Sequence, residues 1–264
     1  MSRLKSAFRN LKKKNAKAFI AFITAGFPSL AATGKLIPEL EKAGADIIEL
    51  GVPFSDPMAD GPIIQYASQE ALKKGVTLEK ILKLVQKARA HTDIPICLMT
   101  YYNPVLSFGE ERFVKQAVSA GVDGLILPDL PPEEGVLLRK AADACGLDII
   151  SFIAPTTPPE RLRFIARAAR GFIYYLSLTG VTGPRQGIAG DLASNVRRIK
   201  KVTDKPVCVG FGVSSHAQVA GIQKSADGVI VGSAIVRKIR EYKDDPLLEV
   251  KVARFVRSLK GRSA

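Results

Sequence analysis

Short apolar runs rich in Val, Ile and Leu alternate along the chain with longer segments whose apolar residues recur at helical spacing. The runs predicted as strands cover residues 18–24, 46–50, 95–100, 124–127, 148–153, 172–176, 206–210 and 227–231. Each of them except the last is followed by a helical segment before the next strand begins, and this alternation is typical of a parallel sheet. Nearly continuous apolar strands indicate burial on both faces of that sheet.

Eight strand–helix repeats within 264 residues favour a closed barrel over an open, doubly wound sheet. We therefore predict an α/β fold in which residues 1–264 form a single-domain (β/α)8 TIM barrel, with an extra N-terminal helix and a long sixth loop. The predicted helices include 3–13, which would cap the barrel floor, 29–43, 110–120, two helices within 62–91 separated at Gly75, and 234–261 with an interruption near residues 244–246.

Two helix-to-strand turns have similar sequences, Lys42-Ala-Gly-Ala-Asp46 and Ser119-Ala-Gly-Val-Asp123. A glycine directly after a helix relieves the strain of a left-handed C-cap. The repetition predicts one structural joint used twice, and it carries no prediction about chemistry.

The chain has a formal net charge of +14, and much of the excess lies near its ends. The basic residues near the two ends are Arg3, Lys5, Arg9, Lys12, Lys13, Lys14, Lys17, Lys35, Arg254, Arg257, Lys260 and Arg262. Such segments can bind nucleic acid or anionic surfaces, or they can be solvated helix faces. We favour solvated faces and expect no nucleic-acid partner, because no aromatic residues are interleaved among the charges.

The basic start followed by the apolar run Ala18–Phe27 could also be taken for a signal peptide. A first barrel strand at 18–24 explains the run better, and no stretch approaches the roughly 20 apolar residues that span a bilayer. We therefore expect a cytoplasmic protein with no membrane association. Three sparse cysteines give no disulfide framework, and the isolated His91 and His216 predict no metal site.

Carboxylates gather after the second predicted strand, in the stretch Glu49-Leu-Gly-Val-Pro-Phe-Ser-Asp-Pro-Met-Ala-Asp-Gly61. Glu49 would point into the barrel mouth if Ile48 and Leu50 face the helices, and burial would raise its pKa to suit a general acid. The loop could return Asp60 over the mouth, so that two carboxylates share acid/base chemistry. The alternative is a strand-end glutamate in an ion pair, followed by solvated turn aspartates.

Glycine-rich loops follow the sixth, seventh and eighth strands, at Thr179–Gly183, Gly210–Ser214 and Gly232–Ala234. Glycines let backbone N–H groups approach an anion, and these late loops form the usual phosphate site of the barrel. The sixth loop, Ser177 to Gly190, is long for a strand-to-helix turn and suits a lid that excludes water. A plain insertion is the alternative.

The motif from Glu49 to Gly61 resembles the signature of the tryptophan synthase alpha subunit family. Further motifs of that family occur in the same order: Phe22-Ile-Thr-Ala-Gly-Phe-Pro28, Met99-Thr-Tyr-Tyr-Asn-Pro104, Leu127-Pro-Asp-Leu-Pro131, Thr179-Gly-Val-Thr-Gly183, Gly210-Phe-Gly212 and Gly232-Ser-Ala234. The similarity covers residues of about 15 to 245, and none of these motifs departs from the pattern.

The resemblance implies a lyase that cleaves indole-3-glycerol phosphate to indole and glyceraldehyde 3-phosphate. By the same resemblance, Glu49 matches the catalytic acid/base and Asp60 the carboxylate that bonds the indole N–H. Thr182 matches the lid residue that engages Asp60, while Phe22 and Tyr174 match pocket residues. The backbone of Gly183, Gly212, Gly232 and Ser233 would hold the phosphate.

The family works with a beta subunit in an alpha2-beta2 complex for tryptophan biosynthesis. The resemblance implies no cofactor in this chain, with pyridoxal phosphate in the beta subunit. Exposed apolar residues beside acidic ones suit a protein contact, and we expect Pro53, Asp56 and Pro57 to meet the beta subunit. The alternative is that this loop packs over the barrel.

Other functions would require different sequence features or a different binding behaviour. A sugar-phosphate isomerase or epimerase would share the late glycine loops but lack the Glu49-to-Gly61 pattern, and metal-dependent epimerases need strand-end histidines that are missing here. A catalytically silent regulatory subunit would not need the two candidate acids. A nucleic-acid-binding barrel would show affinity that falls steeply with salt.

Overall fold

The computed structural model describes residues 2–177, 187–210 and 212–261. Within these residues, eight parallel strands close into a barrel in chain order, and β8 pairs with β1. The strands are β1 Ala18–Thr24, β2 Ile47–Gly51, β3 Ile96–Met99, β4 Gly124–Ile126, β5 Asp148–Ile153, β6 Ile173–Leu176, β7 Val207–Gly210 and β8 Gly228–Val231. The predicted barrel is confirmed, and each strand begins within a residue of its predicted start.

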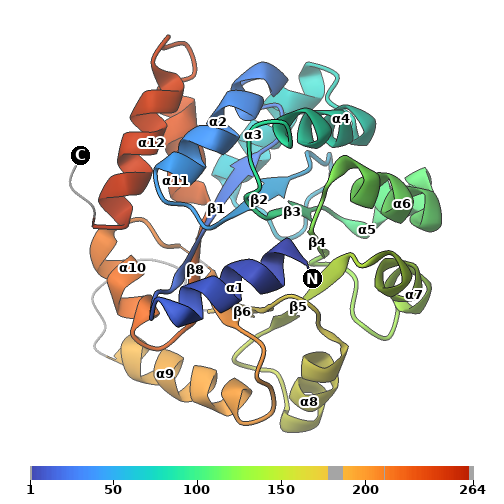
Figure 1. Cartoon of the computed structure of the whole chain (residues 1–264), viewed down its shortest axis with the longest axis vertical. Coiled ribbons are helices and arrows are strands. Elements are labelled where there is room, and N and C mark those ends of the chain that lie inside the picture. The colour runs from blue at the N-terminus through green and yellow to red at the C-terminus, as the bar shows by residue number, and fades with distance from the viewer. Residues whose placement is uncertain (1, 178–186, 211, 262–264) are drawn as a thin grey trace.

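Helices surround the strands, and α1 lies across the ring that they form (Figure 1). The described helices are α1 Arg3–Lys13, α2 Leu30–Lys42, α3 Pro62–Lys73, α4 Leu78–Ala88, α5 Tyr102–Phe108, α6 Glu110–Ala120, α7 Val136–Cys145, α8 Pro159–Ala168, α9 Gly187–Lys200, α10 His216–Gln223, α11 Ser233–Glu241 and α12 Leu248–Leu259. The helix break at Gly75 and the interruption between α11 and α12 are as predicted. The predicted sixth loop is too long at its end, because α9 begins at Gly187 rather than after Gly190.

The N-terminal helix closes the floor of the barrel. Leu4 and Phe8 of α1 are buried in one cluster with inward-facing strand residues such as Ile20, Cys97 and Ile126. On the other face of α1, Lys5, Arg9 and Lys12 are exposed, so the basic start forms an amphipathic helix.

The repeated helix-to-strand turn is one joint, as predicted. Gly44 and Gly121 both have positive φ, at 101° and 92°. The aspartate two residues later accepts a backbone N–H from the preceding strand, Asp46 from Phe19 at 2.8 Å and Asp123 from Ile96 at 2.9 Å. Asp227 accepts the N–H of Val207 in the same way at 2.8 Å. These carboxylates tie neighbouring strands together at the floor.

Two of the cysteines, Cys97 and Cys208, are buried inside the barrel, and burial raises the pKa of each thiol well above its usual value. Thiols of this kind are unreactive. These thiols are therefore structural, and the carboxyl ends of the strands are where a barrel of this kind carries its chemistry.

Candidate active site

Glu49 points into the barrel because side chains alternate along β2. Ile47 belongs to the cluster inside the barrel, whereas Ile48 and Leu50 pack in the layer between strands and helices. Glu49 therefore shares the inward face with Ile47, and it pairs in register with Phe22 of β1 and Cys97 of β3. The predicted orientation of this carboxyl is confirmed.

The carboxyl of Glu49 is fully buried, and neither of its oxygens has a hydrogen-bond partner among the described residues. Burial raises its pKa from 4.5 to about 8, and the charge of Asp60 adds to the rise. An ion-paired strand-end glutamate would show the opposite shift, so that alternative is wrong. At neutral pH this side chain holds a proton that it can give to a bound molecule.

Asp60 returns to the mouth at the end of the loop between β2 and α3. It lines a narrow cleft at the carboxyl ends of β1–β3 together with Phe22, Thr24 and Tyr101. Burial raises the pKa of Asp60, while a hydrogen bond from the Tyr101 hydroxyl lowers it. The hydrogen bond identifies Asp60 as an acceptor with a defined orientation.

Tyr101 is a residue to which the sequence analysis gave no role. Its hydroxyl accepts the backbone N–H of Ala59 at 2.9 Å, and its ring packs on Phe54 with centroids 5.2 Å apart. Tyr101 therefore holds both ends of the loop that carries Asp60. Asp129 was also missed, and it fixes the adjacent turn by accepting the N–H of Tyr102 at 3.0 and 2.9 Å. Tyr101 lies in the motif Met99–Pro104 and Asp129 in the motif Leu127–Pro131, and these motifs were the available signal in the sequence.

Phe22 and Tyr174 lie on the inward face of the barrel near Glu49. Both side chains need a glycine on a neighbouring strand. A Cβ on Gly51 would lie 2.6 Å from the Phe22 ring, and one on Gly210 would lie 2.5 Å from the Tyr174 hydroxyl. Tyr174 is buried, and burial together with the charge of Glu49 raises its pKa well above the usual value. These two rings can enclose a flat apolar group beside the two carboxyls.

Among the described residues of the late loops, those after β8 offer a better anion site than those after β7. Helix α11 begins directly after Gly232, and no side chain of the described residues caps it, so within that part of the chain its first N–H groups are available at Gly232 and Ser233. Helix α10, by contrast, is closed by a capping box between Ser215 and Gln218. Gly212 adopts a positive φ of 64° and is exposed. Thr182 and Gly183, and with them the predicted lid, lie outside the described residues.

A family model described as "Tryptophan synthase alpha chain" matches residues 8–262 of the sequence. The chain belongs to the tryptophan synthase alpha chain family. A tryptophan synthase alpha chain of Geotalea uraniireducens is 53% identical over 261 residues, which cover 99% of this chain and 97% of that protein. One of Geobacter sulfurreducens is 52% identical over 260 residues, covering 98% of each.

Solved structures agree with this membership of the tryptophan synthase alpha chain family. A tryptophan synthase subunit alpha from Legionella pneumophila superposes with a TM-score of 0.89 at 37% identity, covering 99% of both chains. A structure titled for mutual activation in the tryptophan synthase a2b2 complex of Pyrococcus furiosus gives 0.86 at 38% identity, covering 92% of this chain and 98% of that one.

In this member of the tryptophan synthase alpha chain family, the loop expected to meet a partner lies between β2 and α3, and its residues differ in exposure. Asp56 is exposed, Pro57 is half-buried and Pro53 is buried, so Pro53 shapes the loop rather than offering surface. Met58 is 84% exposed, whereas Phe54 packs on Tyr101. An exposed methionine beside an aspartate is an apolar and charged pair suited to contact with another protein.

Two negative findings apply to the described residues alone. No group of three or more His, Cys, Asp or Glu side chains in residues 2–177, 187–210 and 212–261 could hold a metal ion. No helix in that part of the chain has both the length and the apolar character needed to cross a membrane.

Proposed function

We propose that this chain cleaves indole-3-glycerol phosphate to indole and glyceraldehyde 3-phosphate, a carbon–carbon lyase reaction, as the alpha subunit of a tryptophan synthase. The observation that carries the proposal is the Glu49 carboxyl of a member of this family, buried beside Asp60 with no hydrogen-bond partner in the part of the chain that the structure describes. The indole is passed to a beta subunit for tryptophan biosynthesis.

Indole leaves poorly as a carbanion, so the reaction needs a proton on indole C3. In our proposal the neutral Glu49 carboxyl supplies that proton, which creates a cationic indolenine. Loss of the proton from the adjacent glycerol hydroxyl then forms the aldehyde, and the electrons of the broken carbon–carbon bond restore the neutral indole ring. Glu49, ionised after the first step, is the base that we assign to that hydroxyl.

Asp60 has the complementary role of accepting a hydrogen bond from the indole N–H. Positive charge develops at that nitrogen in the transition state, and a carboxylate oriented in advance by Tyr101 stabilises it there. The rings of Phe22 and Tyr174 are proposed to hold the indole between them.

The phosphate of the substrate is assigned to the backbone of Gly183, Gly212, Gly232 and Ser233. The uncapped start of α11 supports this assignment, because free N–H groups and the helix dipole both favour an anion. Thr182 is proposed to close over the bound substrate and engage Asp60.

The chain is proposed to need no cofactor of its own, with pyridoxal phosphate confined to the beta subunit of an alpha2-beta2 complex. Asp56 and Pro57 are the residues assigned to that contact, while the buried Pro53 of the expected set shapes the loop that carries them. The cytoplasm as its compartment and the folding of residues 1–264 as one domain stay predictions from the sequence.

The test is indole release from indole-3-glycerol phosphate, measured with and without a beta subunit. Glu49→Gln keeps the shape of the side chain but removes the proton, so the rate should fall by roughly 10²–10⁴. Glu111→Gln on the exposed face of α6 is the matched control and should behave like wild type. Near-normal release by Glu49→Gln would remove Glu49 from the mechanism.

A further inference from the structure

A small cavity lies on the floor side of the barrel, between α7 and α8, which are neighbours in the ring of helices (Figure 1). Its volume is about 150 Å3, and the residues that line it are Arg139, Asp143, Ile149, Arg167, Ala168 and Arg170. Ile149 is the second residue of β5, so the cavity lies near the amino end of that strand. The proposed reaction takes place at the opposite, carboxyl ends of the strands.

The lining of this cavity is strongly basic. The side chains of Arg139, Arg167 and Arg170 share it with a single carboxylate, that of Asp143, so the lining has a net charge of +2. Asp143 is already paired with Arg170, whose Nε lies 3.2 Å from one carboxylate oxygen. Burial lowers the pKa of the nearby Lys205, and the charge of Arg170 lowers it further. A hollow surrounded by cations in this way attracts an anion.

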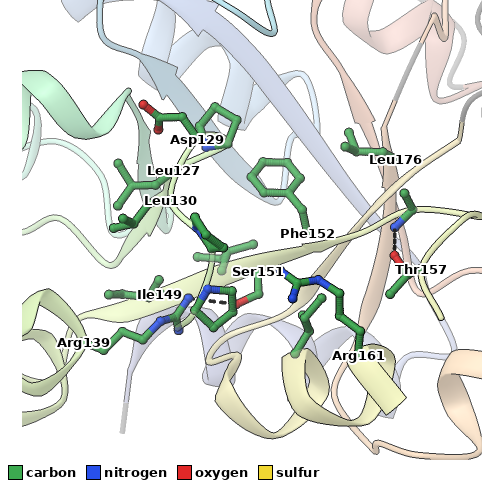
Figure 2. A pocket seen from close by; sticks show the side chains of 16 residues that line it. Leu127, Asp129, Leu130, Arg139, Ile149, Ser151, Phe152, Thr157, Arg161 and Leu176 are labelled. Carbon is green, nitrogen blue, oxygen red and sulfur yellow. Dashed lines mark hydrogen bonds between the residues drawn. The ribbon is translucent and has the colours of Figure 1, made fainter. Parts of the chain in front are cut away.

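Arg139 is the partly buried member of this set. Figure 2 shows its side chain reaching from α7 to Ser151 of β5, whose hydroxyl accepts a hydrogen bond from Arg139 at 3.3 Å. Arg139 also donates to the carbonyl of Ala168 at 3.2 Å, and its buried Nε has no hydrogen-bond partner among the described residues. Burial lowers the pKa of Arg139 more than the charges of Asp143 and Glu133 raise it. A desolvated cation whose bonded acceptors are both uncharged is costly, so an anion is the missing counterpart.

We propose that this floor-side cavity is a binding site for a phosphate group, either inorganic phosphate or the phosphate of a small monoester. Guanidinium groups bind phosphate oxygens through charge-assisted hydrogen bonds, often two at a time. A phosphate group carries a charge of about −1.5 to −2 near neutral pH, which balances the net charge of the lining. The volume is well above the ~15 Å3 that a single water needs, so the cavity has room for a tetrahedral anion.

The placement of the three arginines favours phosphate over a carboxylate. Arg139 comes from α7, Arg167 from the last turn of α8 and Arg170 from the turn before β6, so each can approach a different oxygen of a tetrahedral anion. A carboxylate has a single charge and only two oxygens, and it would leave part of the positive charge unmatched. A bound phosphate would connect α7 to α8, and a ligand that binds only the folded chain also stabilises it against unfolding.

The site is distinct from the phosphate site assigned to the substrate. Gly232 and Ser233 follow the carboxyl end of β8, whereas Ile149 and Arg170 lie near the amino ends of β5 and β6. The inference therefore does not depend on the proposed reaction. Backbone amides at the two places can report the two binding events separately.

The experiment is an NMR titration of the full chain with inorganic phosphate and, separately, with glycerol phosphate, at constant ionic strength. The backbone amides of Ile149, Ala168 and Arg170 should shift saturably with at least one of the two probes, along a curve independent of that for Ser233. Tighter binding of inorganic phosphate would identify the free anion as the ligand. Tighter binding of glycerol phosphate at these floor amides would identify a monoester.

Three variants test the arginines. Arg167→Gln and Arg170→Gln, both at exposed side chains, should each weaken phosphate binding at the floor amides by about tenfold, because charge-assisted hydrogen bonds are lost. Arg139→Gln should weaken it at least as much, and urea unfolding would check that this variant remains folded. Arg163→Gln, an exposed arginine of α8 outside the cavity lining, is the matched control and should leave the binding unchanged.

Three results would overturn the proposal. The first is the absence of saturable shifts at the floor amides of wild type with either probe. The second is equal affinity in wild type, Arg167→Gln and Arg170→Gln. The third is saturation of the same amides by acetate at the same concentrations as phosphate, which would indicate general attraction of anions rather than a phosphate site.

Discussion

Among single residues, the buried Glu49 carboxyl should have a cost that is measurable in the free energy of unfolding. Its pKa rises from 4.5 in the unfolded chain to about 8 in the folded one. Because the folded-state pKa is raised, protonated Glu49 makes its full contribution to the free energy of unfolding below about pH 4.5. That contribution is lost as the pH rises to about 8. Glu49→Gln cannot ionise, so we expect it to gain stability over wild type across this range, by up to about 5 kcal/mol at the upper end.

Urea unfolding at about pH 4.5 and about pH 8 would measure this effect. The difference between wild type and Glu49→Gln should be small at the lower pH and large at the higher one. Glu111→Gln, where the side chain is 81% exposed, should show no such growth. An identical difference at both pH values would mean that Glu49 is not held neutral by the fold.

Asp60 and Tyr101 allow a second residue-scale prediction. Asp60→Asn removes the charge that meets the developing positive charge on indole, so kcat should fall more than the substrate affinity. Tyr101→Phe keeps that charge but removes the hydroxyl that holds Ala59 and Asp60, and it should lower kcat by a smaller factor. Steady-state kinetics of both variants would decide. A change in KM alone for Asp60→Asn would make Asp60 a binding residue.

The two carboxyls and the tyrosine also mark how far sequence reasoning reaches. Glu49 could be found because one charged residue interrupts an apolar strand, and its neighbours fix which way it points. The hydrogen bond that the Tyr101 hydroxyl accepts from the Ala59 N–H could not be found, because it depends on segments brought together by the closed barrel. Local patterns predict orientation, whereas contacts across the fold need coordinates.

Among the elements, strands were the easiest to predict, because every one is a short apolar run preceded by a polar turn. The aspartates at residues 46, 123 and 227 each accept a backbone N–H from a neighbouring strand, which explains why similar turns recur at the floor. The end of the sixth loop was placed too late, since its glycines suggested coil while α9 already starts at Gly187. Glycine lowers helix propensity without forbidding a helix.

The start of α11 provides the prediction at the scale of an element. Gly232→Val should crowd the proposed phosphate cradle and weaken the binding of glycerol phosphate, which calorimetry would measure. A Cβ at Gly232 meets Phe22 at 3.4 Å, so the fold can accept it with a small adjustment. Gly212 is a poorer test because its positive φ of 64° strains any other residue. Gly221→Val on α10, where a Cβ meets nothing within 4 Å, is the control.

Unchanged affinity of Gly232→Val for glycerol phosphate would move the phosphate site away from α11. A loss of affinity in Gly221→Val as well would indicate a general effect on the late half of the barrel. The expected result, loss in the first variant alone, would connect the uncapped helix start to the anion.

For the whole molecule, the two ends of the barrel have different chemistry. The floor carries the basic face of α1 and a set of ion pairs, including Arg89 with Asp123 at 2.7 Å. The mouth carries Glu49, Asp60 and the exposed tip of the loop between β2 and α3. A protein that docks at the mouth can therefore affect Asp60 through a single loop. Such docking does not require the net charge of +14.

This arrangement predicts that a beta subunit activates the chain through that loop. Tyr101 connects Phe54, Ala59 and Asp60, so a contact at Asp56 and Pro57 can shift the position of Asp60. Activity of the isolated chain should be low and should rise when a cognate beta subunit is titrated in. A double variant with Asp56→Ala and Pro57→Ala should need about tenfold more partner for the same activation, as expected when interface contacts are truncated. Asp93→Ala on the floor is the control, and its activation curve should match wild type. Equal activation of the double variant and wild type at the same partner concentrations would show that this loop is not the coupling surface.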